Sequence, residues 1–147
     1  MTRYFLILTL LLITALGASQ QPTAPDNGYT ITIRVLNGKT GKPVKDEKPN
    51  VSLGDAGDPT NPATDSNGEI HLHITSRHRS LGFLPNYYVD CRYKKDQPSP
   101  NGTFSIDEIV SKGIVTGNLC GKAHIEPVPS VLVVYVRKMS FREKWEI

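Results

Sequence analysis

The sequence predicts an all-β fold, a single antiparallel β-sandwich with one short helix in a loop bounded by two cysteines. Three observations support this. Short segments alternate apolar and polar residues, as half-buried strands do. Glycine, proline, asparagine and aspartate separate these segments, as in turns. Only one segment within the domain changes to a helical period, so the strands dominate the fold.

The N-terminus has the pattern of a secretory signal peptide. Arg3 supplies a positive charge, Phe5 to Ala15 are almost purely apolar, and small residues at 17–19 suit cleavage. The apolar run is shorter than the roughly 20 residues that a membrane-spanning helix needs. We therefore expect a secreted or periplasmic protein without a transmembrane span in the mature chain, with an uncleaved anchor as the alternative.

The rest of the chain has the length of one ordinary domain. The composition divides it into the signal peptide (1–18), a polar linker (19–28), the β-sandwich domain (29–138) and a C-terminal tail (139–147).

The first half of the domain is predicted to contain three strands joined by turns, at 29–36, 51–53 and 69–74. In the first strand Ile31, Ile33 and Val35 share one face, which prepares it for a core. In the third strand, alternation directs His71 and His73 to the face opposite the apolar residues.

The second half is predicted to contain two further strands, at 87–93 and 131–136. The last is nearly all apolar, which indicates burial on both faces. Between them, Ser105 and Glu108 have the spacing of a capping box, and Gly113 suits a helix C-terminus. We therefore expect a short helix over 105–112.

The two cysteines, Cys91 and Cys120, have no neighbours at metal-ligand spacing. In an exported protein an even pair favours a disulfide. Closing a loop of about 30 residues would stabilise the fold by about 3 to 4 kcal/mol in the chain-entropy account. The alternative is a reactive thiol, which no histidine adjacent in sequence supports.

Charge and motifs narrow the function classes. A formal net charge of +3 with scattered basic residues is too weak a bias to favour nucleic acid. The sequence contains no nucleophile elbow, phosphate-binding loop or dinucleotide fingerprint. We expect no catalytic residues and no cofactor.

The domain resembles the carboxypeptidase regulatory-like family, which has a transthyretin-like (prealbumin-like) sandwich. The resemblance covers roughly residues 29–93 and rests on four segments in order: Thr40-Gly-Lys-Pro-Val44, Val51-Ser-Leu53, Thr64-Asp-Ser-Asn-Gly-Glu-Ile70 and Leu84-Pro-Asn-Tyr-Tyr-Val89. It implies an Ig-like or prealbumin-like sandwich that serves contacts rather than catalysis. The remaining part of the chain resembles small secreted bacterial proteins.

The residue types in the segments 40–44 and 64–70 are explained by the geometry of turns. Gly41 and Gly68 permit a positive φ, and Pro43 fixes φ where the chain re-enters a strand. Asp65 and Asn67 can bond nearby backbone amides. A calcium loop at 65–69 is disfavoured, because the later ligands of an EF-hand are missing.

Five residues are candidates for binding. His71 and His73 share a face and could bind zinc or copper if a third ligand converged on them, but two imidazoles do not make a site, so no metal is predicted. Tyr87 could stack on a sugar ring, and Phe141 and Trp145 would form one stripe on a helical tail. The alternative for that stripe is that it covers a sheet edge.

The sequence therefore favours a non-catalytic exported sandwich with an interaction or envelope-structural role, whose partner is a protein or a glycan at the cell envelope. Carbohydrate binding is the first alternative, because related sandwiches include starch-binding-like folds. A small hydrolase is a weaker one.

Overall fold

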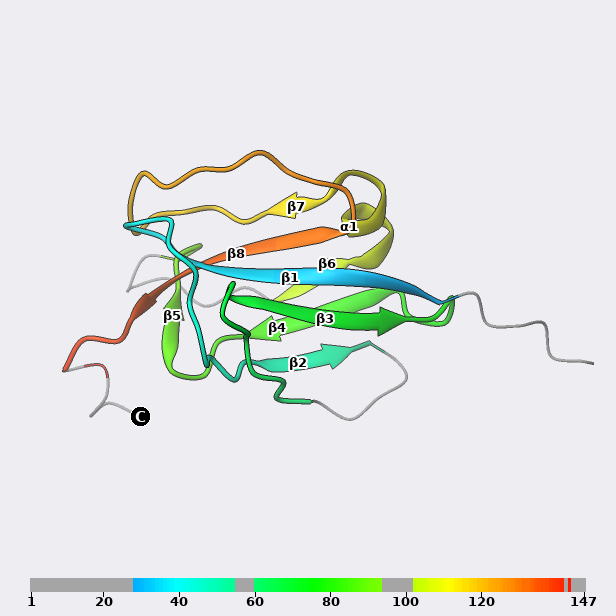
Figure 1. Cartoon of the computed structure of the whole chain (residues 1–147), viewed down its shortest axis with the longest axis horizontal. Coiled ribbons are helices and arrows are strands. Elements are labelled where there is room, and N and C mark those ends of the chain that lie inside the picture. Colours follow the sequence, from blue (N-terminus) through cyan, green and yellow to red (C-terminus); the bar gives the residue numbers. More distant parts are fainter. Residues whose placement is uncertain (1–27, 55–59, 94–101, 142, 144–147) are drawn as a thin grey trace, which may run out of the picture.

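The computed structural model describes residues 28–54, 60–93, 102–141 and 143. The predicted signal peptide, nearly all of the linker and Trp145 lie outside these residues. Two sheets stack to form a sandwich (Figure 1), which confirms the predicted all-β class. The larger sheet has the order β3 (Glu69–Ile74), β1 (Tyr29–Asn37), β8 (Val131–Lys138) and β5 (Tyr88–Asp90), with β7 (Ile114–Val115) also paired to β8. The smaller sheet has the order β2 (Asn50–Leu53), β4 (Ser80–Leu84) and β6 (Thr103–Ser105).

The larger sheet is built on two long strands, β1 (Tyr29–Asn37) and β8 (Val131–Lys138). The alternation of β1 places Ile31, Ile33 and Val35 in the core with no exposed surface. The strand β3 (Glu69–Ile74) pairs antiparallel with β1, with His71 opposite Thr32. The predicted inward face of the first strand is therefore confirmed.

The sheet is mixed, so the prediction of a purely antiparallel sandwich was wrong in this respect. β8 runs parallel to β1, and the short β7 (Ile114–Val115) runs parallel to β8. Between β1 and β8 the chain passes through the second sheet and the helix before it returns. Such a crossover allows β8 to enter beside β1 in the same direction.

The smaller sheet consists of β2 (Asn50–Leu53), β4 (Ser80–Leu84) and β6 (Thr103–Ser105). Sequence patterns did not predict β4, because Gly82 interrupts its short apolar run. In the sheet Gly82 lies opposite Ser52, and a Cβ added to Gly82 would lie 2.2 Å from the Ser52 hydroxyl oxygen. The glycine therefore permits close pairing of the two strands.

The strand β5 (Tyr88–Asp90) is shorter than the predicted 87–93 segment. It pairs with the end of β8, and the chain then turns at Cys91, which forms a disulfide with Cys120. The predicted disulfide is confirmed, and all cysteines of the chain are paired.

The predicted helix is confirmed as α1 (Ile106–Lys112). The Ser105 hydroxyl accepts a hydrogen bond from the Glu108 amide at 3.4 Å. Gly113 ends the helix with φ of 77°. Ile106 and Ile109 are fully buried, so the helix closes one end of the core.

The strand β8 is buried on both faces, as its composition predicts. Leu132, Val134 and Val136 face the core between the sheets. Val133 and Tyr135 face the opposite way, into a second apolar cluster that contains Cys91. The segment 116–130 returns from β7 across this outer side (Figure 1).

Candidate functional site

The structure places the residues of the first predicted turn at the end of β1. Gly41 has φ of 70°, and its amide donates to the Asn37 carbonyl at 2.7 Å. The Asn37 side chain accepts two further amides of the turn. Pro43 then forms an isolated bridge with Leu36, so these residues fix backbone geometry rather than present a site.

The second turn is organised by Asp65. Its Oδ1 atom accepts the amides of Asn67 and Glu69, both at 2.8 Å. Gly68 has φ of 73°, and a Cβ there would lie 2.7 Å from the Val35 carbonyl oxygen. The hydrogen bond from the Glu69 backbone is the main cause that lowers the pKa of Asp65.

The two histidines of β3 are exposed on one face, as predicted. His71 Nδ1 lies 3.1 Å from the Thr32 hydroxyl. His78, a third imidazole close in sequence, accepts the Thr75 amide within its own turn at 3.1 Å. His73 lies opposite Thr30 at the other end of the strand.

The fold brings Asp65 and Glu69 to His71, a grouping that the histidine spacing did not predict. One ligand-type atom from each of the three lies within 4.8 Å of the others. However, Glu69 Oε1 is paired with the Arg34 guanidinium at 2.7 Å, and Asp65 Oδ1 is saturated by backbone amides. A guanidinium at this position disfavours a divalent cation. Arg34 and Glu69 therefore form a cross-strand ion pair beside Asp65 and His71.

The most unusual polar residue, Glu47, was not predicted from the sequence. It lies in the charged segment 45–48, which is typical of a solvated loop, yet it is only 1% exposed. Its Oε1 atom accepts the amides of Asn86 at 2.6 Å and Tyr87 at 3.0 Å. Among the described residues, Oε2 has no hydrogen-bond partner.

Thr64 holds the backbone of Glu47 in place. The Thr64 hydroxyl accepts the Glu47 amide at 3.0 Å and donates to the Val44 carbonyl at 2.8 Å. The Thr64 amide donates to the Glu47 carbonyl at 2.8 Å. Because Thr64 is itself 2% exposed, the carboxylate projects from a fixed and buried platform.

This platform carries an exposed turn between β4 and β5. Tyr87 is 62% exposed and Leu84 is 51% exposed. The next residue, Tyr88, packs against the core, and burial followed by the charge of Glu47 raises its pKa. The turn therefore has one aromatic residue anchored inward and one presented to solvent.

Aromatic residues outside this turn have different surroundings. Tyr93 is partly buried and lies beside Arg92, whose guanidinium carbon is 5.2 Å from the ring centroid. Phe141 is 77% exposed, whereas Trp145 lies outside the described residues. A stripe formed by these last two residues therefore stays a prediction.

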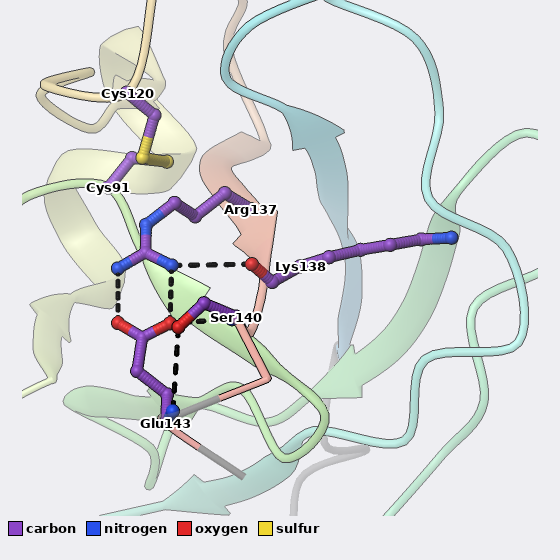
Figure 2. A network of polar contacts seen from close by, with 6 residues as sticks. All are labelled: Cys91, Cys120, Arg137, Lys138, Ser140 and Glu143. Carbon is purple, nitrogen blue, oxygen red and sulfur yellow. Dashed lines mark hydrogen bonds and ion pairs between the residues drawn. A yellow bond between two sulfur atoms is a disulfide. The ribbon is translucent and has the colours of Figure 1, made fainter.

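The beginning of the tail is held against β8 by an ionic network (Figure 2). Arg137 donates to both carboxylate oxygens of Glu143, at 2.8 and 2.6 Å. Glu143 also accepts the Ser140 amide at 2.6 Å, and the Ser140 hydroxyl accepts the Glu143 amide at 3.4 Å. This reciprocal pair has the hydrogen-bond pattern of a capping box. The bonds from Arg137 are the main cause that holds the pKa of Glu143 far below its usual range.

Comparison of the chain with protein-family models, with the curated proteins and with the solved structures finds no match in any of the three. Within the described ranges, no helix has the length and apolar character needed to cross a membrane. Disulfides persist in oxidising compartments, which is the setting that the Cys91–Cys120 bridge indicates.

Proposed function

We propose that this protein is an exported, non-catalytic β-sandwich that binds a partner protein at the cell envelope through the Tyr87 turn. The observation that carries the proposal is the pair of hydrogen bonds from the amides of Asn86 and Tyr87 to the buried carboxylate of Glu47.

The energetics of Glu47 support this assignment. Burying a carboxylate is costly unless hydrogen bonds compensate it. Here the bonds that compensate the buried carboxylate also fix the backbone of an exposed turn. A turn whose backbone is ordered beforehand loses less conformational freedom on binding, and tyrosine is enriched at interface hot spots.

Other charged side chains form ion pairs within the fold. This structural use of the charged residues also supports a binding role rather than catalysis. The Arg34–Glu69, Arg92–Asp90 and Arg137–Glu143 pairs join neighbouring parts of the structure. The apolar run at the N-terminus and the disulfide support export to the cell envelope or beyond. The resemblance to regulatory-like sandwich domains supports a contact role.

Site-specific photo-crosslinking tests the proposal. A benzoylphenylalanine at position 87 should give a discrete crosslinked product in cell-envelope preparations, and excess unlabelled wild-type chain should suppress it. Excess Tyr87→Ala chain should not. The same probe at Lys112, an exposed residue on α1, is the control. Identical products from both positions, or suppression by Tyr87→Ala, would contradict the proposal.

Carbohydrate binding is the second candidate function, and the exposed ring of Tyr87 is the observation that favours it. Aromatic rings that bind sugars must offer an open face, which Tyr87 does and Tyr88 does not. A glycan array and a polysaccharide pull-down should then show retention that Tyr87→Ala abolishes. Absence of retention on every glycan would exclude this candidate.

A further inference from the structure

A pocket of about 420 Å³ lies on the outer side of β8, away from the core between the sheets. Residues 115–118 and 121–124 form its walls, and Tyr135 contributes to its lining from β8. Its size lies within the range of roughly 300 to 1,000 Å³ that is usual for small-molecule sites.

The walls of this pocket are fixed. The Asn118 side-chain amide donates to the carbonyls of Gly38 at 2.7 Å and Ala123 at 2.9 Å, so it joins the two walls to the turn that follows β1. The adjacent Leu119 amide donates to the Cys91 carbonyl, and the Cys91–Cys120 disulfide ties the same wall to the sheet. These contacts connect both walls to the sheet and to each other.

Tyr135 carries a buried hydroxyl that none of the described residues satisfies. The residue is 1% exposed. The Ile125 backbone is close enough to lower the pKa of the phenol, against the larger effect of burial, but it does not meet the geometry of a hydrogen bond. A buried donor without an acceptor is uncommon and calls for a physical explanation.

Two further polar groups of the pocket, Thr116 and Lys122, can act as donors. The Thr116 hydroxyl accepts the Tyr135 amide at 3.2 Å, and no described residue accepts its own proton. Lys122 forms no ion pair with any residue that the structure describes. His124 also lines the pocket, and its Nε2 atom lies 3.5 Å from a carboxylate oxygen of Glu126, which is not a lining residue. None of the described lining residues carries a carboxylate.

A pocket lined by hydroxyl donors and a free ammonium group complements a ligand rich in acceptors. We propose that this pocket binds a small organic anion through a carboxylate or phosphate group. Lys122 supplies the charge, and the Thr116 hydroxyl donates a hydrogen bond to the oxyanion. The Tyr135 oxygen has almost no accessible surface in the unbound chain, so its hydroxyl donates a second bond once the ring turns toward the pocket. The site is separate from the Tyr87 turn and does not depend on the function proposed for that turn.

The test uses the full mature chain with its disulfide intact and three probes that share a sugar skeleton: glucuronate, glucose 6-phosphate and glucose. Amide chemical shifts of Gly117 and Gly121 report on binding. We expect saturable shifts with one or both anions and none with glucose. The anion that binds more tightly identifies the carboxylate or the phosphate as the recognised group.

Two variants identify the residues responsible. Tyr135→Phe and Lys122→Gln should each weaken anion binding by about tenfold to a hundredfold, the usual effect of losing a bond to a charged group. Tyr135→Phe should leave thermal stability unchanged or raise it, since it removes an unsatisfied hydroxyl. Lys45→Gln, a substitution of another exposed lysine, should leave binding unchanged.

Three outcomes would overturn the proposal. Equal binding of glucose would remove the requirement for an anion. The absence of any saturable shift would leave a pocket that holds water only. Anion binding that Lys122→Gln weakens but Tyr135→Phe does not would indicate attraction to the surface rather than occupation of the pocket.

Discussion

The backbone amide of Tyr87 donates a hydrogen bond of 3.0 Å to the carboxylate of Glu47, across 40 positions of sequence. One partner is almost fully buried and the other presents a mostly exposed ring. This relationship joins the interior of the sandwich to a turn that carries an exposed aromatic residue. The carboxylate of Glu47 therefore orders the backbone of the exposed Tyr87 turn.

Replacing Glu47 should destabilise the fold although its segment looks like a solvated loop. Glu47→Ala leaves two amide donors without their acceptor, and we expect a loss of about 2 to 4 kcal/mol in the free energy of unfolding. Glu47→Gln should cost less, since its amide oxygen can still accept, though more weakly. Urea denaturation measures both. Glu126→Gln, at a side chain that is 87% exposed, is the control; an equal effect there would refute this role.

The turn at Gly68 should tolerate no side chain. Its φ of 73° and the 2.7 Å approach of a Cβ to the Val35 carbonyl oxygen both oppose substitution. Gly68→Ala should therefore lower stability by about 1 to 3 kcal/mol. Gly117→Ala is the matched control, because a Cβ there meets nothing within 4 Å. Similar losses for both variants would show that the turn geometry is not responsible.

Loss of the disulfide should reduce stability more than any surface change. The bridge spans a sequence separation of 29 residues, for which loop-closure entropy predicts about 3 to 4 kcal/mol. The Cys91→Ser/Cys120→Ser double variant, compared with the oxidised wild type in urea, measures it. A difference below about 1 kcal/mol would mean that the segment 116–130 is held by its hydrogen bonds alone.

The docking of the tail should weaken in acid. Arg137 and Ser140 hold the pKa of Glu143 below its ordinary value of 4.5. The unfolded chain therefore takes up a proton first as pH falls, so this contribution is present above the ordinary pKa and is lost on acidification. At neutral pH, Glu143→Gln should cost about 1 kcal/mol or less, because the pair is partly exposed.

A pH series of unfolding free energies for wild type and Glu143→Gln tests this sign. The two curves should be separated at neutral pH and converge as the solution becomes acidic. A separation that stays constant down to about pH 2 would show that ionisation of Glu143 does not contribute.

The sequence predicted those parts of the fold that depend on local pattern. The alternation of Ile31, Ile33 and Val35, the cap at Ser105 and the apolar run of β8 each follow from neighbours in the chain. The strand β4 was missed because Gly82 weakens its pattern, and its fit against Ser52 exists only after folding. The parallel pairing of β8 depends likewise on a crossover through the second sheet.

The candidate sites were less predictable. Sequence spacing placed His71 and His73 on one face, but it could not show that Asp65, Glu69 and Arg34 meet there. Glu47 carries no local mark of burial, because its partners lie 39 and 40 positions away. The burial of the Tyr135 hydroxyl depends on the segment 116–130, which covers it only in the folded chain, so the sequence around Tyr135 does not predict it.

The most direct test of the account uses the envelope partner that crosslinking identifies. Its affinity is measured for three versions of the chain: wild type, Tyr87→Ala and Leu119→Ala. Leu119, which is 57% exposed elsewhere on the surface, is the matched control. We expect Tyr87→Ala to weaken binding at least tenfold while its unfolding free energy stays within about 0.5 kcal/mol of wild type. Leu119→Ala should bind like wild type. Unchanged affinity in Tyr87→Ala would contradict the assignment of the turn held by Glu47 as the binding surface.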